Sequence, residues 1–199
     1  MKIIGLCGGS GSGKGVVCSL FRKREIPTID TDLVYRELAS APGPMLDALA
    51  EEFGSEIITA DGGLNRRALA DLVFGRPDTA QRLAILNKIS HKYILDETRT
   101  RLHAFSLGGA ALAIVDAPVL FESGFNTECD AVICVIADKE TRIKRIMERD
   151  ALTRGGAEKR ISSQMSDAEL LSKCDYAIYN DSDIESVDTQ VGDVLSKLL

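Results

Sequence analysis

The sequence predicts an α/β fold: a doubly wound, five-stranded parallel sheet that carries a helical insert and a helical lid. Five short apolar runs alternate with segments whose apolar residues have helical spacing. Most of these runs are continuously apolar, which is typical of strands buried on both faces of a parallel sheet. A glycine-rich turn follows the first run directly, as expected for a phosphate-binding α/β protein.

The predicted strands share a content of apolar and β-branched residues, and they cover residues 2–6, 26–30, 111–116, 130–137 and 175–180. Helical patterns follow the first and fourth runs and close the chain, at residues 16–24, 139–150 and 184–199.

The connection between the second and third strands is 78 residues long, far more than one crossover helix requires. Its own pattern is helical, at residues 44–53, 64–74 and 78–105. We therefore expect a core built from residues 1–32 and 111–199, with residues 33–110 as an inserted helical subdomain. An insert at the carboxyl edge of a parallel sheet lies over the ligand crevice, where a second substrate is held.

Composition limits the class of protein. The chain has 199 residues, 45% of them hydrophobic and 27% charged, which excludes a disordered chain or a disulfide scaffold. A net charge of −6 argues against a nucleic-acid-coating protein and requires any phosphate site to be local. The five cysteines are an odd number without C-x-x-C spacing, so we expect free thiols in the cytoplasm. No apolar run approaches the ~18 residues of a membrane span.

The strongest motif is GGSGSGKG at residues 8–15, where Gly8, Gly13 and Lys14 match the core of a phosphate-binding P-loop. Its backbone N–H groups and the following helix N-terminus would bind phosphates, and Lys14 would reach the terminal ones. The hydroxyl residue that normally follows the lysine is replaced by Gly15, and Val16 comes next. Either the chain binds nucleotide without good metal chemistry, or phosphate oxygens and water hold the Mg²⁺.

Candidate carboxylates follow the second and third strands. Asp30 and Asp32 alternate along the second strand if it extends that far, and Asp32 could accept the proton of an attacking hydroxyl. Either aspartate could instead cap the next helix. Arg36, one helical turn after Asp32, could bind a phosphate or form a surface salt bridge. Asp116 could hold Mg²⁺ through water or shape a turn.

Residues 139–160 contain eight basic and four acidic residues, a local +4 in an acidic chain. The run could be a mobile lid that neutralises a migrating phosphoryl group through residues such as Arg154, or a solvated helix face. The solvated face would include Lys139, Lys144 and Lys159. The sequence shows no partner for His91, so a structural or surface role is its default.

Together these segments resemble the dephospho-CoA kinases over nearly the full length. The matching segments, in chain order, are GLCGGSGSGK, IDTDLVYRE, GGLNRRALADLVF, ISHKYI, DAPVLFESG, TRIKRIMERD and CDYAIYND. The resemblance implies transfer of a phosphoryl group from ATP to the ribose 3′-hydroxyl of dephospho-CoA, with Mg²⁺. It also implies a core like that of the nucleoside monophosphate kinases, a CoA-binding insert and a lid at about residues 145–165.

The resemblance also implies roles for residues. The ATP loop falls on Gly11, Ser12, Gly13, Lys14, Gly15 and Val16. The catalytic residues would be Asp32 as general base, Lys14 and Arg149. Dephospho-CoA would be bound by Asp32, Arg36, His91 and Arg154. The Mg²⁺ would be organised by Asp32 and Asp116.

Two alternatives stay open at this point. One is another small-molecule P-loop kinase with a nucleotide or sugar acceptor. The other is a non-catalytic nucleotide-binding module, which Gly15 favours. Neither a nucleic acid nor a membrane is expected as a partner, and the sequence does not indicate an oligomeric state.

Overall fold

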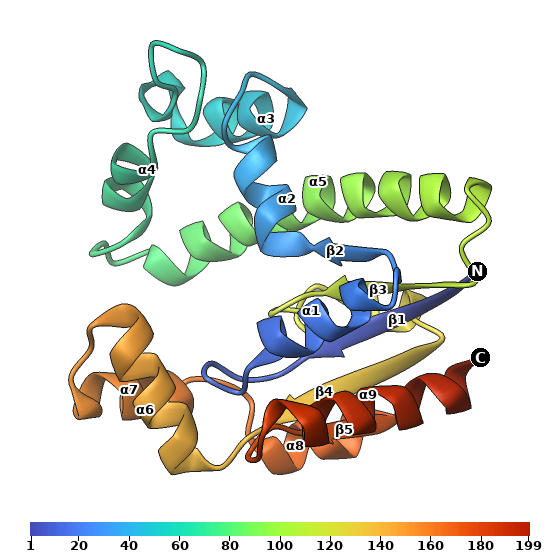
Figure 1. The fold of residues 1–199 in the computed structure, drawn as a ribbon. Coiled ribbons are helices and arrows are strands. Elements are labelled where there is room, and N and C mark those ends of the chain that lie inside the picture. The colour runs from blue at the N-terminus through green and yellow to red at the C-terminus, as the bar shows by residue number, and fades with distance from the viewer. The chain divides into compact units, whose positions relative to one another are not determined.

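The computed structural model describes residues 1–199 and confirms the α/β fold with a five-stranded parallel sheet (Figure 1). The chain divides into two compact units. The first, here the sheet unit, comprises Met1–Asp30 and Leu102–Leu199. The second, the helical unit, comprises Thr31–Arg101.

In the sheet unit the strands lie in the order β2-β3-β1-β4-β5, and all neighbouring pairs are parallel. In chain order they are β1 Lys2–Cys7, β2 Thr28–Asp30, β3 Leu112–Asp116, β4 Ala131–Ile136 and β5 Tyr176–Tyr179. Every residue of β3 and β4 is buried, in agreement with their continuous apolar sequence. Each strand falls within two residues of its predicted bounds.

The register brings the carboxyl ends of the central strands to one edge. Leu6 of β1 lies beside Asp116 of β3, and Asp116 in turn lies beside Asp30 of β2. Cys7, the last residue of β1, lies beside Cys134 of β4. The glycine-rich loop begins immediately after Cys7, so the loop and the Asp116 carboxylate share this edge of the sheet.

The remaining helical elements of the sheet unit are α1 Lys14–Lys23, η2 Phe125–Glu128, α6 Lys139–Asp150, α7 Arg154–Ser162, α8 Asp167–Lys173 and α9 Ile184–Leu198. Helices α1 and α9 pack beside one another on the sheet (Figure 1). Their contact with the strands forms the main core, which includes Ile4, Leu20, Phe21, Ile133 and Val191. This packing fixes the start of α1, and with it the end of the glycine-rich loop.

A capping box at the start of α8 fixes the end of the short segment that joins α7 to α8. The Ser166 side chain accepts a hydrogen bond from the Glu169 N–H, and the Ser166 N–H donates one to the Glu169 carboxylate. Such a reciprocal capping box sets where a helix begins. It therefore fixes Asp167 as the first residue of α8, three residues after Gln164.

The helical unit contains α2 Thr31–Leu38, α3 Pro44–Phe53, η1 Ser55–Ile57, α4 Arg66–Val73 and most of α5 Thr79–Leu107. Its core is formed by buried side chains that include Met45, Leu46, Leu49, Ile57 and Val73. Residues of α5 such as Leu86 and Ile89 pack against that core. Since α5 continues unbroken past Arg101, the unit boundary lies within a helix, whereas the sequence analysis places the end of the insert at residue 110.

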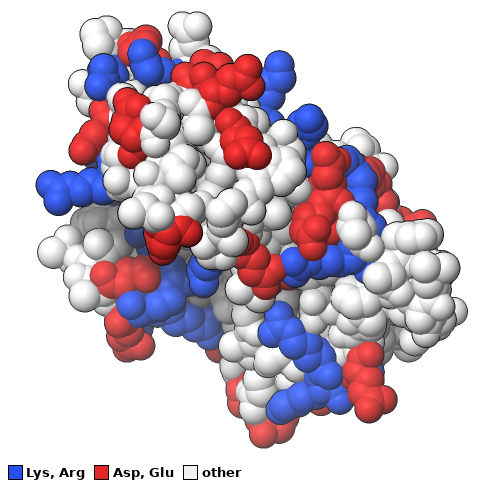
Figure 2. All heavy atoms as spheres, turned by 90° about the horizontal axis from the view of Figure 1, so that it is seen from above, with Lys and Arg blue, Asp and Glu red and all other residues white.

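Figure 2 shows basic and acidic side chains interspersed over the visible face, so the net charge of −6 is not collected there into one acidic field. No helix combines the length and the apolar character needed to cross a membrane.

The core of the sheet unit makes a direct stability prediction. Leu20 of α1 is 2% exposed within the main core, so Leu20→Ala should lower the free energy of unfolding by about 2–5 kcal/mol. Leu171 of α8 is 38% exposed, and Leu171→Ala should change it by less than about 0.5 kcal/mol. Urea denaturation followed by circular dichroism measures both. Equal losses in the two variants would contradict the assigned core.

Candidate active site

The loop between β1 and α1 has the backbone of a phosphate-binding loop. Gly11 and Gly13 have φ angles of 79° and 87°, which other residues rarely adopt. The Ser12 N–H donates to the Gly9 carbonyl at 3.1 Å and closes a turn. Because Lys14 and Gly15 open α1, their N–H groups have no acceptor within the helix and lie at its positive end. An anion is the ligand that such a terminus favours.

Lys14 and Asp116 form an ion pair at the carboxyl edge of the sheet. The Asp116 side chain is 9% exposed, and its second oxygen accepts a hydrogen bond from the Cys18 thiol at 3.2 Å. Burial raises the pKa of the Cys18 thiol, so the sulfur keeps its proton and stays a donor. The structure thus brings together two predicted site residues, Lys14 and Asp116, and adds Cys18, which the sequence analysis did not single out.

Gly15 occupies open space. A Cβ at this position would meet no atom within 4 Å, and its φ angle lies outside the left-handed range. The helix would therefore accept a serine here without strain. The missing hydroxyl is a property of the sequence rather than a demand of the packing.

The condition for Asp30 and Asp32 to alternate along one strand, an extension of the strand to Asp32, is not met. Strand β2 ends at Asp30 and α2 begins at Thr31, so Asp32 lies in the first helical turn and the two do not alternate along one strand. Asp32 and Arg36 are both exposed and lie one turn apart on α2, as their spacing predicts. His91 lies on α5, half-buried. These three belong to the helical unit, and their roles stay predictions.

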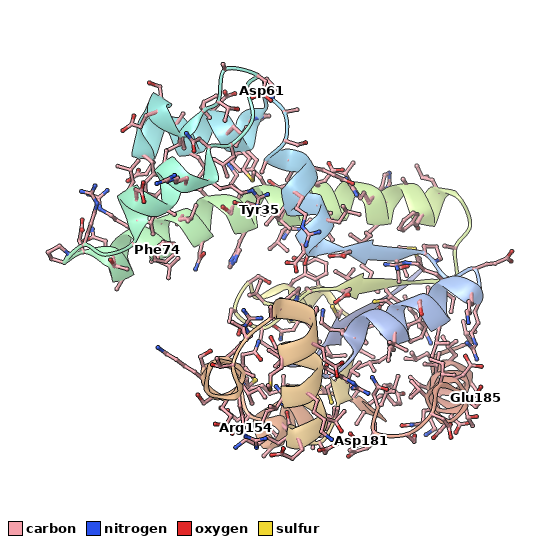
Figure 3. The ribbon with its side chains drawn as sticks, turned by 60° about the vertical axis from the view of Figure 1, so that its left-hand side comes forward. Tyr35, Asp61, Phe74, Arg154, Asp181 and Glu185 are labelled. Carbon is pink, nitrogen blue, oxygen red and sulfur yellow. The ribbon has the colours of Figure 1, made fainter.

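The two arginines assigned to the predicted lid, Arg149 and Arg154, form ion pairs with nearby carboxylates. Arg149 donates two hydrogen bonds of 2.9 Å to the neighbouring Asp150. Arg154, labelled in Figure 3, pairs with Glu140 at 2.6 Å and with Glu158 at 3.0 Å. The hydrogen bond from Arg154 lowers the pKa of Glu140. Roles for Arg149 and Arg154 toward substrate stay predictions.

The three lysines of the basic run lie on the solvated face, as predicted: Lys139, Lys144 and Lys159 are all exposed. The small apolar contact between α6 and α7 involves Ile143, Ile146 and Ala157. It packs the predicted lid helices against each other.

Several residues that contact the loop escaped the sequence analysis. Arg145 of α6 donates to the Gly11 and Ser12 carbonyls at 3.3 and 3.4 Å and to the Asn180 carbonyl at 3.0 Å. The buried Asn180 amide donates to the Ser12 carbonyl at 2.8 Å. The position of Asn180 just after β5, at the carboxyl edge, was the available signal. Arg145 was visible only as one basic residue among eight.

A cavity of about 240 Å³ opens beside the loop. It is bounded by Gly8 and Gly9, by the segment from Pro118 to Glu122, and by Gln164. The segment is part of DAPVLFESG, so this motif lines space next to the glycine-rich loop.

All five cysteines are free thiols, as predicted. Burial raises the pKa of the Cys129 thiol to about 12, which keeps it protonated at neutral pH.

Comparison with known proteins agrees with this geometry. The family model for dephospho-CoA kinase matches residues 2–186. The dephospho-CoA kinase of Syntrophotalea carbinolica is 36% identical over 199 residues, which cover all of this chain and 93% of that protein. A solved structure from Thermus thermophilus aligns with a TM-score of 0.79 and 29% identity, over all of this chain and 98% of the other.

The solved dephospho-CoA kinase from Campylobacter jejuni shares the fold, with a TM-score of 0.73 and 22% identity over all of this chain and 98% of its own. The chain thus combines a phosphate-binding loop and a buried ion pair with a match to kinases along its length. A kinase of this family uses ATP as co-substrate. The chain belongs to the dephospho-CoA kinase family.

Proposed function

We propose that this chain transfers the γ-phosphoryl group of ATP to the ribose 3′-hydroxyl of dephospho-CoA, giving coenzyme A and ADP, in the cytoplasm. The observation that carries the proposal is the GGSGSGK loop with its Lys14–Asp116 pair, within a chain that matches the family over its length. The match over residues 2–186 includes the helical unit, which a bare nucleotide-binding module would not need.

In the proposed reaction the 3′-oxygen forms a bond to the γ-phosphorus while the bond to the β,γ-bridging oxygen breaks. ADP leaves with the electron pair of that bond, and the hydroxyl proton passes to the Asp32 carboxylate. Lys14 and the loop N–H groups stabilise the charge on the phosphates, and Arg149 adds positive charge from the lid. Such catalysis consists mainly of positioning and electrostatic stabilisation, which suits a rigid loop on a buried sheet.

The residues around the loop fit a Mg²⁺ ion that is held largely by phosphate and water. Mg²⁺ retains several waters and needs only one or two carboxylates in sites of this kind. Asp116 supplies a carboxylate at the edge that bears the loop, and Asp32 is proposed as a second. The ion would neutralise charge on the phosphates, and no hydroxyl from position 15 is required.

The helical unit is the proposed binding unit for dephospho-CoA. Arg36 and His91 are assigned to its recognition, with Arg154 contributed by the lid. Arg36 is exposed on α2, one turn beyond Asp32, so one helix would carry both a base and a group that binds phosphate.

The function is tested by incubating the chain with ATP, Mg²⁺ and dephospho-CoA and following the products by mass spectrometry. One added phosphoryl group on dephospho-CoA, with equimolar ADP, is the expected result. A parallel panel of nucleoside monophosphates and sugars should stay unphosphorylated. Phosphorylation of a panel member in preference to dephospho-CoA would replace this proposal with another kinase activity.

Asp32→Asn should lower kcat about 10²-fold or more while the Kd for ATP changes little, because the amide cannot accept the proton. Asp47→Asn is the matched control, since Asp47 is likewise exposed in the first turn of a helix of the same unit. Steady-state kinetics and nucleotide titration measure the two effects. An unchanged kcat in Asp32→Asn would remove Asp32 from the mechanism.

Gly15→Ser should lower the Mg²⁺ concentration needed for half-maximal activity, because the new hydroxyl adds a ligand in a space that is open. Gly43→Ser, which also meets no atom within 4 Å but lies in the helical unit, should leave it unchanged. Magnesium titrations of both variants provide the comparison. If the requirement does not fall in Gly15→Ser, the hydroxyl is irrelevant to metal binding in this chain.

A further inference from the structure

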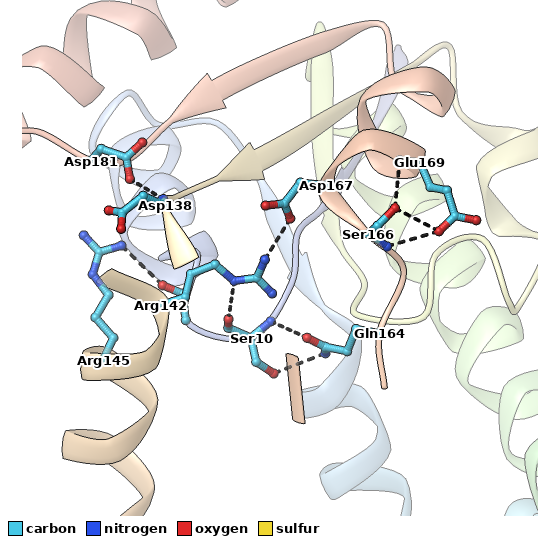
Figure 4. A network of polar contacts seen from close by, with 10 residues as sticks. Ser10, Asp138, Arg142, Arg145, Gln164, Ser166, Asp167, Glu169 and Asp181 are labelled. Carbon is cyan, nitrogen blue, oxygen red and sulfur yellow. Dashed lines mark hydrogen bonds and ion pairs between the residues drawn. The ribbon is translucent and has the colours of Figure 1, made fainter. Parts of the chain in front are cut away.

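Ser10, the third residue of the glycine-rich loop, is held by side chains on both of its peptide groups (Figure 4). Its N–H donates to Gln164 Oε1 at 2.8 Å, and its Oγ accepts from Gln164 Nε2 at 3.2 Å. Its carbonyl accepts from Arg142 Nε at 2.9 Å. Two side chains from outside the loop therefore engage every polar atom of Ser10.

These contacts set the direction of neighbouring loop groups. A trans peptide points its N–H and its C=O in opposite directions, and the chain has no cis peptide. Because Arg142 holds the Ser10 carbonyl, the Gly11 N–H points away from Arg142. Because Gln164 holds the Ser10 N–H, the Gly9 carbonyl points away from Gln164, and there it accepts from the Ser12 N–H at 3.1 Å.

Arg142 is built into the loop rather than placed on its surface. Its side chain is 4% exposed, it pairs with Asp167 at 2.7 Å, and its second terminal nitrogen is buried without a hydrogen-bond partner. A Cβ at Gly9 would lie 2.9 Å from the Arg142 Cζ, and a Cβ at Gly11 would lie 2.9 Å from its Cα. Arg142 therefore joins the loop to Asp167 of α8 through a buried side chain.

The same contacts fasten both ends of the predicted lid. Arg142 lies on α6, before the lid helix α7, and Gln164 lies in the turn that follows α7. The segment between them contains the lid arginines, yet both ends are hydrogen-bonded to Ser10. The lid is thus attached at each end to the residue that precedes the Gly11 N–H.

We propose that Gln164 is a positioning residue for phosphoryl transfer. With Arg142 it holds Ser10 so that the Gly11 N–H faces the phosphates of the nucleotide, and it ties the end of the lid to the loop. The proposal rests on the proposed kinase function for its catalytic meaning. Its effect on nucleotide binding can be measured without the acceptor.

The test uses Gln164→Met, which preserves length and volume but can neither accept from the Ser10 N–H nor donate to its Oγ. Gln190 provides a matched control, because its amide makes the same kind of contacts to the Tyr179 backbone, at 2.8 and 2.9 Å, on β5. Gln190→Met removes a similar clamp from a strand residue rather than from a residue of the loop.

ADP affinity is measured by calorimetry, and the KM values for ATP and dephospho-CoA by steady-state kinetics. Gln164→Met should weaken ADP binding about fivefold to tenfold and raise the KM for ATP, with the KM for dephospho-CoA unchanged. Gln190→Met should lower the melting temperature but leave ADP affinity within about twofold. An ADP affinity within twofold of the parent in Gln164→Met, or equal losses in both variants, would overturn the proposal.

Gln164→Glu keeps an acceptor for the Ser10 N–H. It provides a second test in case the methionine variant does not fold. At high salt, where the added charge is screened, Gln164→Glu should bind ADP almost as tightly as the parent chain does at the same salt concentration. If it binds ADP no better than Gln164→Met under these conditions, the hydrogen bond to Ser10 is not what matters. Because ADP binding needs no acceptor substrate, these outcomes stand even if no coenzyme A is formed.

Discussion

The Lys14–Asp116 ion pair is the interaction on which the site depends. It joins the first residue of α1 to the last residue of β3, and the parallel register of β1 and β3 brings the two ends to one edge. Both charges are largely buried, so each needs the other as long as no other ion is near. A phosphate would compete with Asp116 for Lys14, which links nucleotide binding to release of the carboxylate that is proposed to organise Mg²⁺.

The basic residues of the predicted lid form ion pairs that are less buried than the Lys14–Asp116 pair. The sequence places a net +4 in residues 139–160, but the structure pairs Arg149, Arg154 and Arg160 with nearby carboxylates. The Arg154–Glu140 pair is exposed and screened by solvent, and such pairs are weak enough for a phosphate to replace. Asp150, which pairs with both Arg149 and Arg160, is half-buried. Arg142 and Arg145 differ because they contact the loop itself. The basic run therefore contains an inner set that shapes the loop and an outer set that could exchange partners.

The fold was predictable because its strands β3 and β4 are apolar runs buried on both faces, and because α6 follows its predicted bounds from Lys139 to Asp150. The loop was predictable because its glycines and lysine are adjacent in sequence. The contacts of Gln164 and Asn180 were not, since both are single polar residues whose partners lie 154 and 168 positions away. The start of α2 at Thr31 was not predictable either, because apolar periodicity does not define the boundary where a helix directly follows a strand.

Cys18 shows how the site can dispense with a hydroxyl at position 15. Lys14 and Cys18 lie one turn apart on α1, so both project from one face of the helix. The lysine gives Asp116 a cation, and the protonated thiol gives its other oxygen a neutral donor. The carboxylate is thereby oriented by the helix that carries the P-loop lysine, without help from residue 15. If a phosphate draws Lys14 away, the Cys18 thiol still donates to one oxygen of Asp116.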